Sequence, residues 1–210
     1  MSIATPISDD YKTAILDLLP DQGHWAEGEY LWLTDHTNRL VEFTDGFIEQ
    51  LPMPTDFHQS IVQFLFCALL VFITPTGGKI HFAPVRLLVR KGKYREPDIL
   101  LVKAANDPRR LDRFWKGADL TLEVVSEDKA ERDLIDKRFD YAEGNVPEYW
   151  IVNPLTETIT VLRLDNGAYA EHGVFSRGDM ATSIILPGFS VKVSEVFDIE
   201  RRPNDAEDAD

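Results

Sequence analysis

Residues 123–154 constrain the fold of this chain more than any other stretch, because they contain the pattern of a strand, a helix and a strand. The run TLEVV is rich in β-branched residues and ends at polar residues, which is typical of a short strand. Apolar side chains then recur at helical spacing over about 128–143, and Gly144 and Asn145 end this predicted helix. Pro147 precedes a second apolar run, EYWIV. The segment therefore predicts a β-sheet with a helix folded back along it.

Two acidic residues stand in or beside short apolar strands. Glu123 lies within TLEVV, and Asp98 follows Pro97 and directly precedes the run ILLV. A carboxylate buried alone is costly, so each needs a partner or a metal ion. Neighbouring strands lie about 4.8 Å apart, a spacing at which both carboxylates can share a divalent cation such as Mg²⁺. The alternative for Asp98 is a turn-capping role after Pro97.

Lys137 is predicted to join the two acids. Glu123 lies about 10 Å before the end of its strand, at roughly 3.3 Å per residue. Lys137 lies about 12 Å along the following helix, at roughly 1.5 Å per residue. The strand after Glu123 and the helix before Lys137 have similar lengths and run in opposite directions. Lys137 is therefore expected to lie beside Glu123. The alternative is a surface ion pair between Lys137 and Asp133.

The other elements extend this pattern into a mixed fold. Short helices are expected over 10–19 and 25–33, and the turns at 44–46 and 165–167 indicate two β-hairpins. The run 56–73 is apolar nearly all round, which predicts a long buried helix. Pro84 interrupts a strand predicted over 79–90. This order predicts an α/β (α+β) fold, in which helices flank a central mixed β-sheet that has N-terminal and C-terminal β-hairpins.

Composition and length indicate the cellular compartment and the number of domains. With 44% apolar and 28% charged residues, the chain has the composition of a soluble globular protein. Its 210 residues predict one domain over 10–199, a disordered N-terminus at 1–9 and an acidic disordered tail at 200–210. The single cysteine, Cys67, and the absence of a visible secretory signal favour a cytoplasmic location. FLFCALLVFI is too short to span a bilayer, so no membrane association is expected.

Pro97-Asp98 and Glu123-Val124-Val125 resemble the core of the PD-(D/E)XK nuclease superfamily. More narrowly, the chain is similar to the Uma-type family of restriction endonucleases over roughly residues 25–195. The similarity is carried by VEFTDGFIEQLPMP, His58, PDILLV, EVVSE, Lys137, Tyr141 and NVPEYWIVNP. It implies a restriction-endonuclease-like core.

The resemblance also implies roles for single residues. Asp98, Glu123 and Lys137 would be catalytic, and the backbone carbonyl of Val124 would join Asp98 and Glu123 in binding Mg²⁺, with Mn²⁺ as a substitute. His58 and Tyr141 would be accessory groups; each also has a structural alternative, as a polar neighbour or a packing residue. Glu42 either completes the metal site or is a surface residue of the first hairpin. Glu148 is predicted to be exposed, and Trp150 to pack in the core.

The sequence departs from the family pattern at two positions. The lysine usually found two positions after the second acid is Val125 here, and the family places this lysine on the following helix, which corresponds to Lys137. Phe47 stands where family members often carry a glutamate after the Asp-Gly turn.

Two basic segments flank the predicted acids. The net charge of −14 argues against indiscriminate nucleic-acid binding, which depends on neutralising phosphates. The local clusters nevertheless predict contacts with a DNA backbone, with solvated loops as the alternative. Their members are Arg86, Arg90, Lys91, Lys93 and Arg95 before Asp98, and Arg109, Arg110, Arg113 and Lys116 after it.

These features predict a divalent-metal-dependent endonuclease that hydrolyses phosphodiester bonds. The expected partner is nucleic acid, with DNA favoured, and a homodimer is one arrangement that would help to choose the target. The alternative is a catalytically inactive interaction or nucleic-acid-binding module on the same fold, which Val125, Phe47 and the net negative charge favour.

Overall fold

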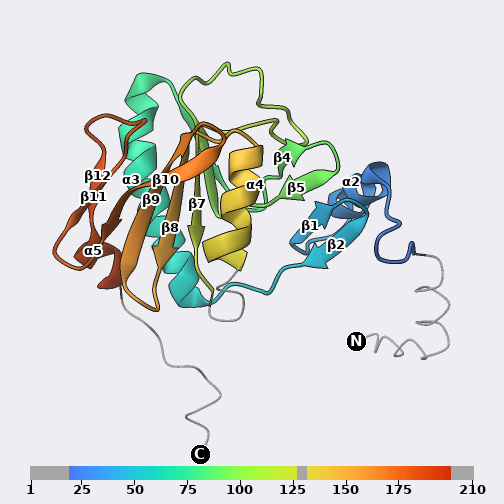
Figure 1. Ribbon diagram of the computed structural model, residues 1–210, viewed down its shortest axis with the longest axis horizontal. Helices are drawn as coiled ribbons and strands as arrows, with labels where there is room; N and C mark the ends of the chain where they lie inside the picture. The colour runs from blue at the N-terminus through green and yellow to red at the C-terminus, as the bar shows by residue number, and fades with distance from the viewer. Residues whose placement is uncertain (1–18, 127–131, 200–210) are drawn as a thin grey trace, which may run out of the picture.

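The computed structural model describes residues 19–126 and 132–199 (Figure 1). Four expectations lie outside these residues: the N-terminal segment 1–9, most of the helix predicted over 10–19, the first part of the helix predicted from about 128, and the tail 200–210. Within the described ranges the strands form a six-stranded, a four-stranded and a two-stranded sheet.

The largest sheet has its strands in the order β10-β9-β8-β7-β6-β3. They are β3 (Lys79–Phe82), β6 (Ile99–Val102), β7 (Leu120–Val124), β8 (Glu148–Asn153), β9 (Thr158–Asp165) and β10 (Ala168–Phe175). β7 and β8 are parallel, and the other neighbours are antiparallel. A parallel pair needs a crossover, which here contains the π-helical turn η3 (Arg132–Asp136) and α4 (Lys137–Glu143). The predicted central mixed sheet flanked by helices is confirmed.

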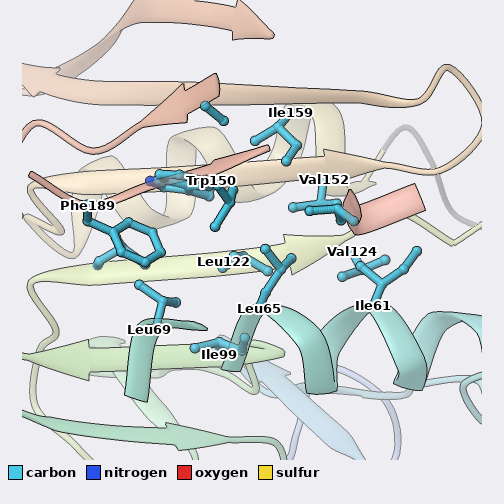
Figure 2. Close-up of a cluster of buried hydrophobic side chains, with 14 of the residues drawn as sticks. Ile61, Leu65, Leu69, Ile99, Leu122, Val124, Trp150, Val152, Ile159 and Phe189 are labelled. Atoms are coloured by element: carbon cyan, nitrogen blue, oxygen red, sulfur yellow. The ribbon is translucent and has the colours of Figure 1, made fainter. Parts of the chain in front are cut away.

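Helix α3 (Asp56–Ile73) covers one face of this sheet and α4 covers the other (Figure 1). Ile61, Leu65 and Leu69 of α3 point toward apolar side chains of β6, β7 and β8 (Figure 2). Because both faces are covered, every residue of β6 and β7 is buried. Side chains alternate along a strand, so Leu122 and Val124 belong to the α3 side while Glu123 points toward α4.

The smaller four-stranded sheet has the order β2-β1-β5-β4. It comprises β1 (Val41–Thr44), β2 (Phe47–Gln50), β4 (Leu87–Arg90) and β5 (Lys93–Arg95), with α2 (Glu27–Asp35) packed nearby. The first predicted hairpin is correct, since Asp45 and Gly46 have φ values of 48° and 90°. The single strand predicted over 79–90 is wrong: β3 belongs to the larger sheet and β4 to the smaller. Pro84 lies between them, where its missing N–H cannot serve either ladder.

The C-terminal part adds β11 (Met180–Thr182), β12 (Ser190–Lys192) and the short helix α5 (Val193–Phe197). Val191, Val193 and Val196 extend the core on the α3 side of the larger sheet. The hairpin predicted around residues 165–167 is β9 and β10, as expected.

Helix α3 departs from its predicted burial. Ile61, Leu65 and Leu69 are buried, but Val71 is 75% exposed and Cys67 is also exposed. The apolar sequence therefore covers more of the helix surface than the sheet can bury. By length and composition alone, Asp56–Thr76 would suffice to cross a membrane, a criterion that core helices also meet.

A buried carboxyl group lies at the end of a strand of the smaller sheet. Glu96 follows β5, is 5% exposed, and has one side-chain oxygen without a hydrogen-bond partner among the described residues. Burial raises its pKa from 4.5 to about 8, and the nearby charge of Arg86 only partly offsets this. The folded protein therefore holds this proton more tightly than the unfolded chain does.

This shift predicts a loss of stability with rising pH. A raised pKa in the folded state contributes stability below pH 4.5, and this contribution disappears as the pH rises through about 8. The free energy of unfolding of the wild type should fall by about 3 kcal/mol more than that of Glu96→Gln between pH 5 and pH 8. The glutamine has no proton to lose over this range. Both proteins are compared in buffer without metal ions. Urea denaturation at both pH values measures this difference. Parallel pH profiles of the two proteins would contradict the prediction.

Candidate active site

Asp98 stands at the start of β6, directly beside β7. The antiparallel register that pairs Ile99 with Leu122 sets Asp98 opposite Glu123 when it is continued by one residue. Asp98 Oδ2 accepts a hydrogen bond from the backbone N–H of Val124 at 2.8 Å. The Asp98 side chain is 18% exposed, so this carboxylate is the part of the site that solvent reaches.

Glu123 is held from the α4 side by two groups. Its Oε2 lies 2.8 Å from Lys137 Nζ, and its Oε1 accepts a hydrogen bond from the Tyr141 hydroxyl. Lys137 and Tyr141 are four residues apart on α4, so they lie on the same face of the helix. The Lys137 and Glu123 side chains are only 7% and 3% exposed, respectively. The structure thus brings the predicted site residues Glu123, Lys137 and Tyr141 together, and the Tyr141 hydroxyl orients the Glu123 carboxylate.

Burial also fixes the protonation of the tyrosine. It raises the pKa of Tyr141 well above its ordinary value, and the charge of Glu123 acts in the same direction. Tyr141 therefore remains a hydrogen-bond donor to Glu123 throughout the physiological pH range.

His58 reaches the site from the first turn of α3. Its Nε2 lies 3.1 Å from the carbonyl oxygen of Val124 and 3.3 Å from Asp98 Oδ2. Both neighbours are acceptors, so Nε2 carries a proton in this arrangement. Burial lowers the pKa of His58, but the hydrogen bond and charge of Asp98 and the charge of Glu123 outweigh it, so the pKa is raised overall. Its Nδ1 is buried and has no partner within the described part of the chain.

The donor atoms fit a metal ion in part. No three side chains of His, Cys, Asp or Glu in residues 19–126 and 132–199 are grouped closely enough to hold one. Asp98 Oδ2 and the Val124 carbonyl oxygen nevertheless converge on the same point, marked by His58 Nε2. These are the hard oxygen donors that Mg²⁺ and Mn²⁺ accept. Glu123 would become a further ligand when an oxygen is released from Lys137 or Tyr141.

Glu42 is placed differently from the other predicted ligands. It is 1% exposed on β1, which excludes the surface alternative. Its Oε1 accepts a hydrogen bond from Glu96 N at 3.0 Å, while its Oε2 contacts Arg132 and lies 3.4 Å from Arg95 Nε. Its oxygens are therefore engaged by two arginines and a backbone amide, which suits an anchor better than a metal ligand.

Most of the predicted DNA-backbone residues are engaged in ion pairs within the protein. Their contacts are Arg86 with Asp35, Arg90 with Asp45 and Glu143, Lys93 with Asp140 and Glu143, Arg95 with Asp140 and Glu42, Arg109 with Asp107 and Asp119, and Arg113 with Asp35. Arg110 lies over the Trp115 ring at 5.4 Å. Among the described residues, Lys91 and Lys116 have no ion-pair partner.

Asp140 is a site-supporting residue that the sequence did not single out. It lies on α4 between Lys137 and Tyr141, and its two oxygens are 2.8 Å from Lys93 Nζ and 2.7 Å from Arg95 Nε. It therefore ties the helix that carries Lys137 to β5 of the smaller sheet. The partners of Asp140, Lys93 and Arg95, are more than 40 residues away in the sequence. In the sequence, only the spacing of three residues between Lys137 and Asp140 could have indicated that Asp140 supports the site.

The comparisons with known proteins identify the family and the fold. The sequence profile of the Uma2 family, described as a putative restriction endonuclease, matches residues 28–194. Among solved structures, the fold is similar to that of a putative nuclease belonging to DUF820 from Anabaena variabilis, with a TM-score of 0.66 and 18% identity over 77% of this chain and 92% of that chain. At this identity, the likeness shows a shared fold. No curated protein matches the chain. Because the family match spans most of its length, the chain belongs to the Uma2 family.

Proposed function

We propose that this protein is a divalent-metal-dependent endonuclease that hydrolyses phosphodiester bonds of DNA. Family membership and the nuclease fold support a nuclease. The observation that carries the finer proposal is the buried contact of 2.8 Å between Glu123 and Lys137 beside Asp98. An acid pair with one lysine, set on adjacent strands and a covering helix, would provide both ligands for a cation and a positive charge for a phosphate.

The metal ion would be held by Asp98, Glu123 and the carbonyl oxygen of Val124, with Mg²⁺ as the expected ion and Mn²⁺ as a substitute. When bound, such an ion polarises the scissile phosphate and lowers the pKa of a water molecule. Lys137 provides a positive charge at the place where negative charge develops on the phosphoryl oxygens. Tyr141 contacts Glu123, and Asp140 anchors α4 to β5, so together they hold Lys137 beside the two acids.

The surface charge bears on how DNA would be held. Because most of the flanking arginines are neutralised by acids of the same chain, the cations that remain for phosphates are Lys91, Arg110 and Lys116. With few such contacts and a net charge of −14, DNA binding is expected to be weak at physiological salt. The engaged arginines would contribute only where a phosphate displaces their carboxylate partner.

A cleavage assay with a matched variant tests the proposal. The 210-residue protein is incubated with supercoiled, linear and single-stranded DNA in Mg²⁺, Mn²⁺ or EDTA, beside Glu123→Gln. This variant keeps an acceptor for Tyr141 but removes the charge facing Lys137, so we expect cleavage to fall at least about 100-fold. Glu171→Gln, at an exposed residue of strand β10, is expected to cleave like the wild type.

The same assay separates the proposal from its alternative. The closed contacts of Glu123 with Lys137 and Tyr141 are also compatible with a catalytically inactive module. Such a module would bind DNA equally well as wild type and as Glu123→Gln, and neither protein would cleave it with any metal. Metal-dependent cleavage that is lost in Glu123→Gln but kept in Glu171→Gln would exclude this alternative.

A further inference from the structure

We propose that His58 Nε2 is itself a ligand of the metal ion, so that the site binds Mn²⁺ more tightly than Mg²⁺. This inference rests on the metal site of the proposed function and goes beyond it, because it assigns a nitrogen ligand and an ion preference. Neither follows from the two carboxylates alone.

The first argument is the spacing of three atoms. His58 Nε2 lies 3.1 Å from the Val124 carbonyl oxygen and 3.3 Å from Asp98 Oδ2. Two neighbouring ligands of an octahedral ion with bonds of about 2.1 Å lie about 3 Å apart. The nitrogen therefore stands at ligand-to-ligand distance from both oxygens that the metal site requires. An ion bound by these oxygens would lie within reach of Nε2.

The second argument is that His58 is held in place by its helix. The Thr55 side chain caps α3 by accepting a hydrogen bond from the backbone N–H of His58 at 3.2 Å. The next turns of α3 are anchored in the core by Ile61 and Leu65 (Figure 2). The His58 side chain is only 14% exposed. A ligand fixed in this way loses little conformational freedom when an ion binds.

The third argument concerns the proton. In the metal-free arrangement Nε2 donates to two acceptors, and an ion bound there must take the place of that proton. The single proton of a neutral imidazole then lies on Nδ1, which is buried and has no acceptor among the described residues. This unsatisfied donor costs free energy, so the bond between Nε2 and the ion has to outweigh it, and the measured Mn²⁺ affinity includes that cost.

The competing interpretation is that His58 only donates hydrogen bonds to Asp98 and Val124. The two interpretations differ in chemistry, because Mg²⁺ takes oxygen ligands whereas imidazole suits first-row transition ions. A donor that merely orients Asp98 would affect both ions alike. A direct nitrogen ligand raises the affinity for Mn²⁺ specifically, and we expect Mn²⁺ to bind at least about tenfold more tightly than Mg²⁺.

Electron paramagnetic resonance of the 210-residue protein titrated with Mn²⁺ alone tests the inference. The signal of free Mn²⁺ gives the affinity, competition with Mg²⁺ gives the preference, and pulsed measurements detect a directly bound imidazole nitrogen. We expect wild type to show the nitrogen coupling and His58→Gln to lose it, with Mn²⁺ affinity reduced about 10- to 100-fold. His36→Gln, at a histidine that bonds the Trp32 carbonyl on α2, is the matched control and should match wild type.

Each remaining result decides against a defined part of the proposal. Bound Mn²⁺ without nitrogen coupling, or with coupling that persists in His58→Gln, would show that His58 is not a ligand while leaving the metal site intact. An absence of Mn²⁺ binding would overturn this inference together with the metal dependence of the proposed function. Coupling from His58 in a protein that cleaves no DNA would uphold the inference and count against the nuclease. Circular dichroism melting of the variants checks that each is folded.

Discussion

Asp98→Asn is expected to lower the rate of metal-dependent cleavage by about 1,000-fold, because in the proposed mechanism it removes a charged ligand from the ion that would activate water and phosphate. The neutral amide oxygen is a weak ligand for a hard cation, so both metal affinity and turnover should fall. The Asp98 side chain is 18% exposed, so solvent reaches this carboxylate. Initial rates at saturating Mg²⁺ and Mn²⁺ measure the effect.

The same substitution should leave the fold almost unchanged. The structural task of Asp98 is to accept the hydrogen bond from Val124 N at 2.8 Å, and the Asn side-chain carbonyl can accept it as well. We therefore expect the free energy of unfolding to change by less than about 1 kcal/mol. The loss of activity would then report on chemistry rather than on folding.

Asp119→Asn is the matched control for Asp98→Asn. Asp119 directly precedes β7, and its Oδ2 accepts a hydrogen bond from the backbone N–H of Lys103 at 2.7 Å, as Asp98 does from Val124. Its other oxygen pairs with Arg109 and lies outside the candidate site. Full activity in Asp119→Asn with loss in Asp98→Asn supports the proposed role, and near-normal cleavage by Asp98→Asn would remove Asp98 from the mechanism.

Local signals explain why much of the fold could be predicted. The bounds of α3 follow from an apolar run between Thr55, a capping residue, and Pro75. The first hairpin follows from Asp45-Gly46, whose positive φ values the turn requires. Lys137 could be placed beside Glu123 because a strand and a returning helix have fixed rises per residue. Each inference depends on residues close together in the sequence.

The errors concern contacts between distant segments. Arg95 appears in the sequence as part of a basic cluster, but its partners Asp140 and Glu42 come from α4 and β1. No periodicity indicates that these acids meet it. The division of residues 79–90 between two sheets is also a tertiary choice, which Pro84 permits but does not specify. A cluster of basic residues in the sequence therefore predicts a positively charged surface only when acidic residues elsewhere in the chain do not pair with it.

Glu148→Ala is expected to cause the largest loss of stability, about 4 kcal/mol. The sequence predicts an exposed strand residue here, but Glu148 is fully buried. Its Oε1 accepts hydrogen bonds from Trp150 Nε1 and Ser183 Oγ, both at 2.6 Å. Its Oε2 accepts the backbone N–H groups of Ile184 and Ile185 at 2.6 and 3.0 Å. Truncation leaves the buried Trp150 donor and the half-buried donors of residues 183–185 without this acceptor, and an unsatisfied buried donor costs about 1–3 kcal/mol.

The stability of Glu148→Gln should lie between that of the wild type and that of Glu148→Ala. The amide retains one oxygen acceptor, but its NH₂ group meets donors on the other side, so we expect a loss of about 2 kcal/mol. Urea denaturation, monitored by tryptophan fluorescence, measures the free energy of unfolding of all three proteins. The signal is suitable because the Trp150 indole donates a hydrogen bond to the Glu148 carboxylate. Glu171→Ala, on the exposed strand β10, is the control and should remain within about 0.5 kcal/mol of the wild type.

The Glu148 variants also decide what the motif NVPEYWIVNP does. If the motif serves the fold, Glu148→Gln should cleave DNA at the wild-type rate per folded molecule, because Glu148 binds the 183–185 turn and makes no contact with Asp98, Glu123 or Lys137 among the described residues. A proportionate loss of activity and of folded protein would give the same conclusion. A loss of cleavage in fully folded Glu148→Gln would instead place the motif in the reaction. We expect the first outcome, since a carboxylate with both oxygens engaged by neutral donors has no lone pair directed at a substrate.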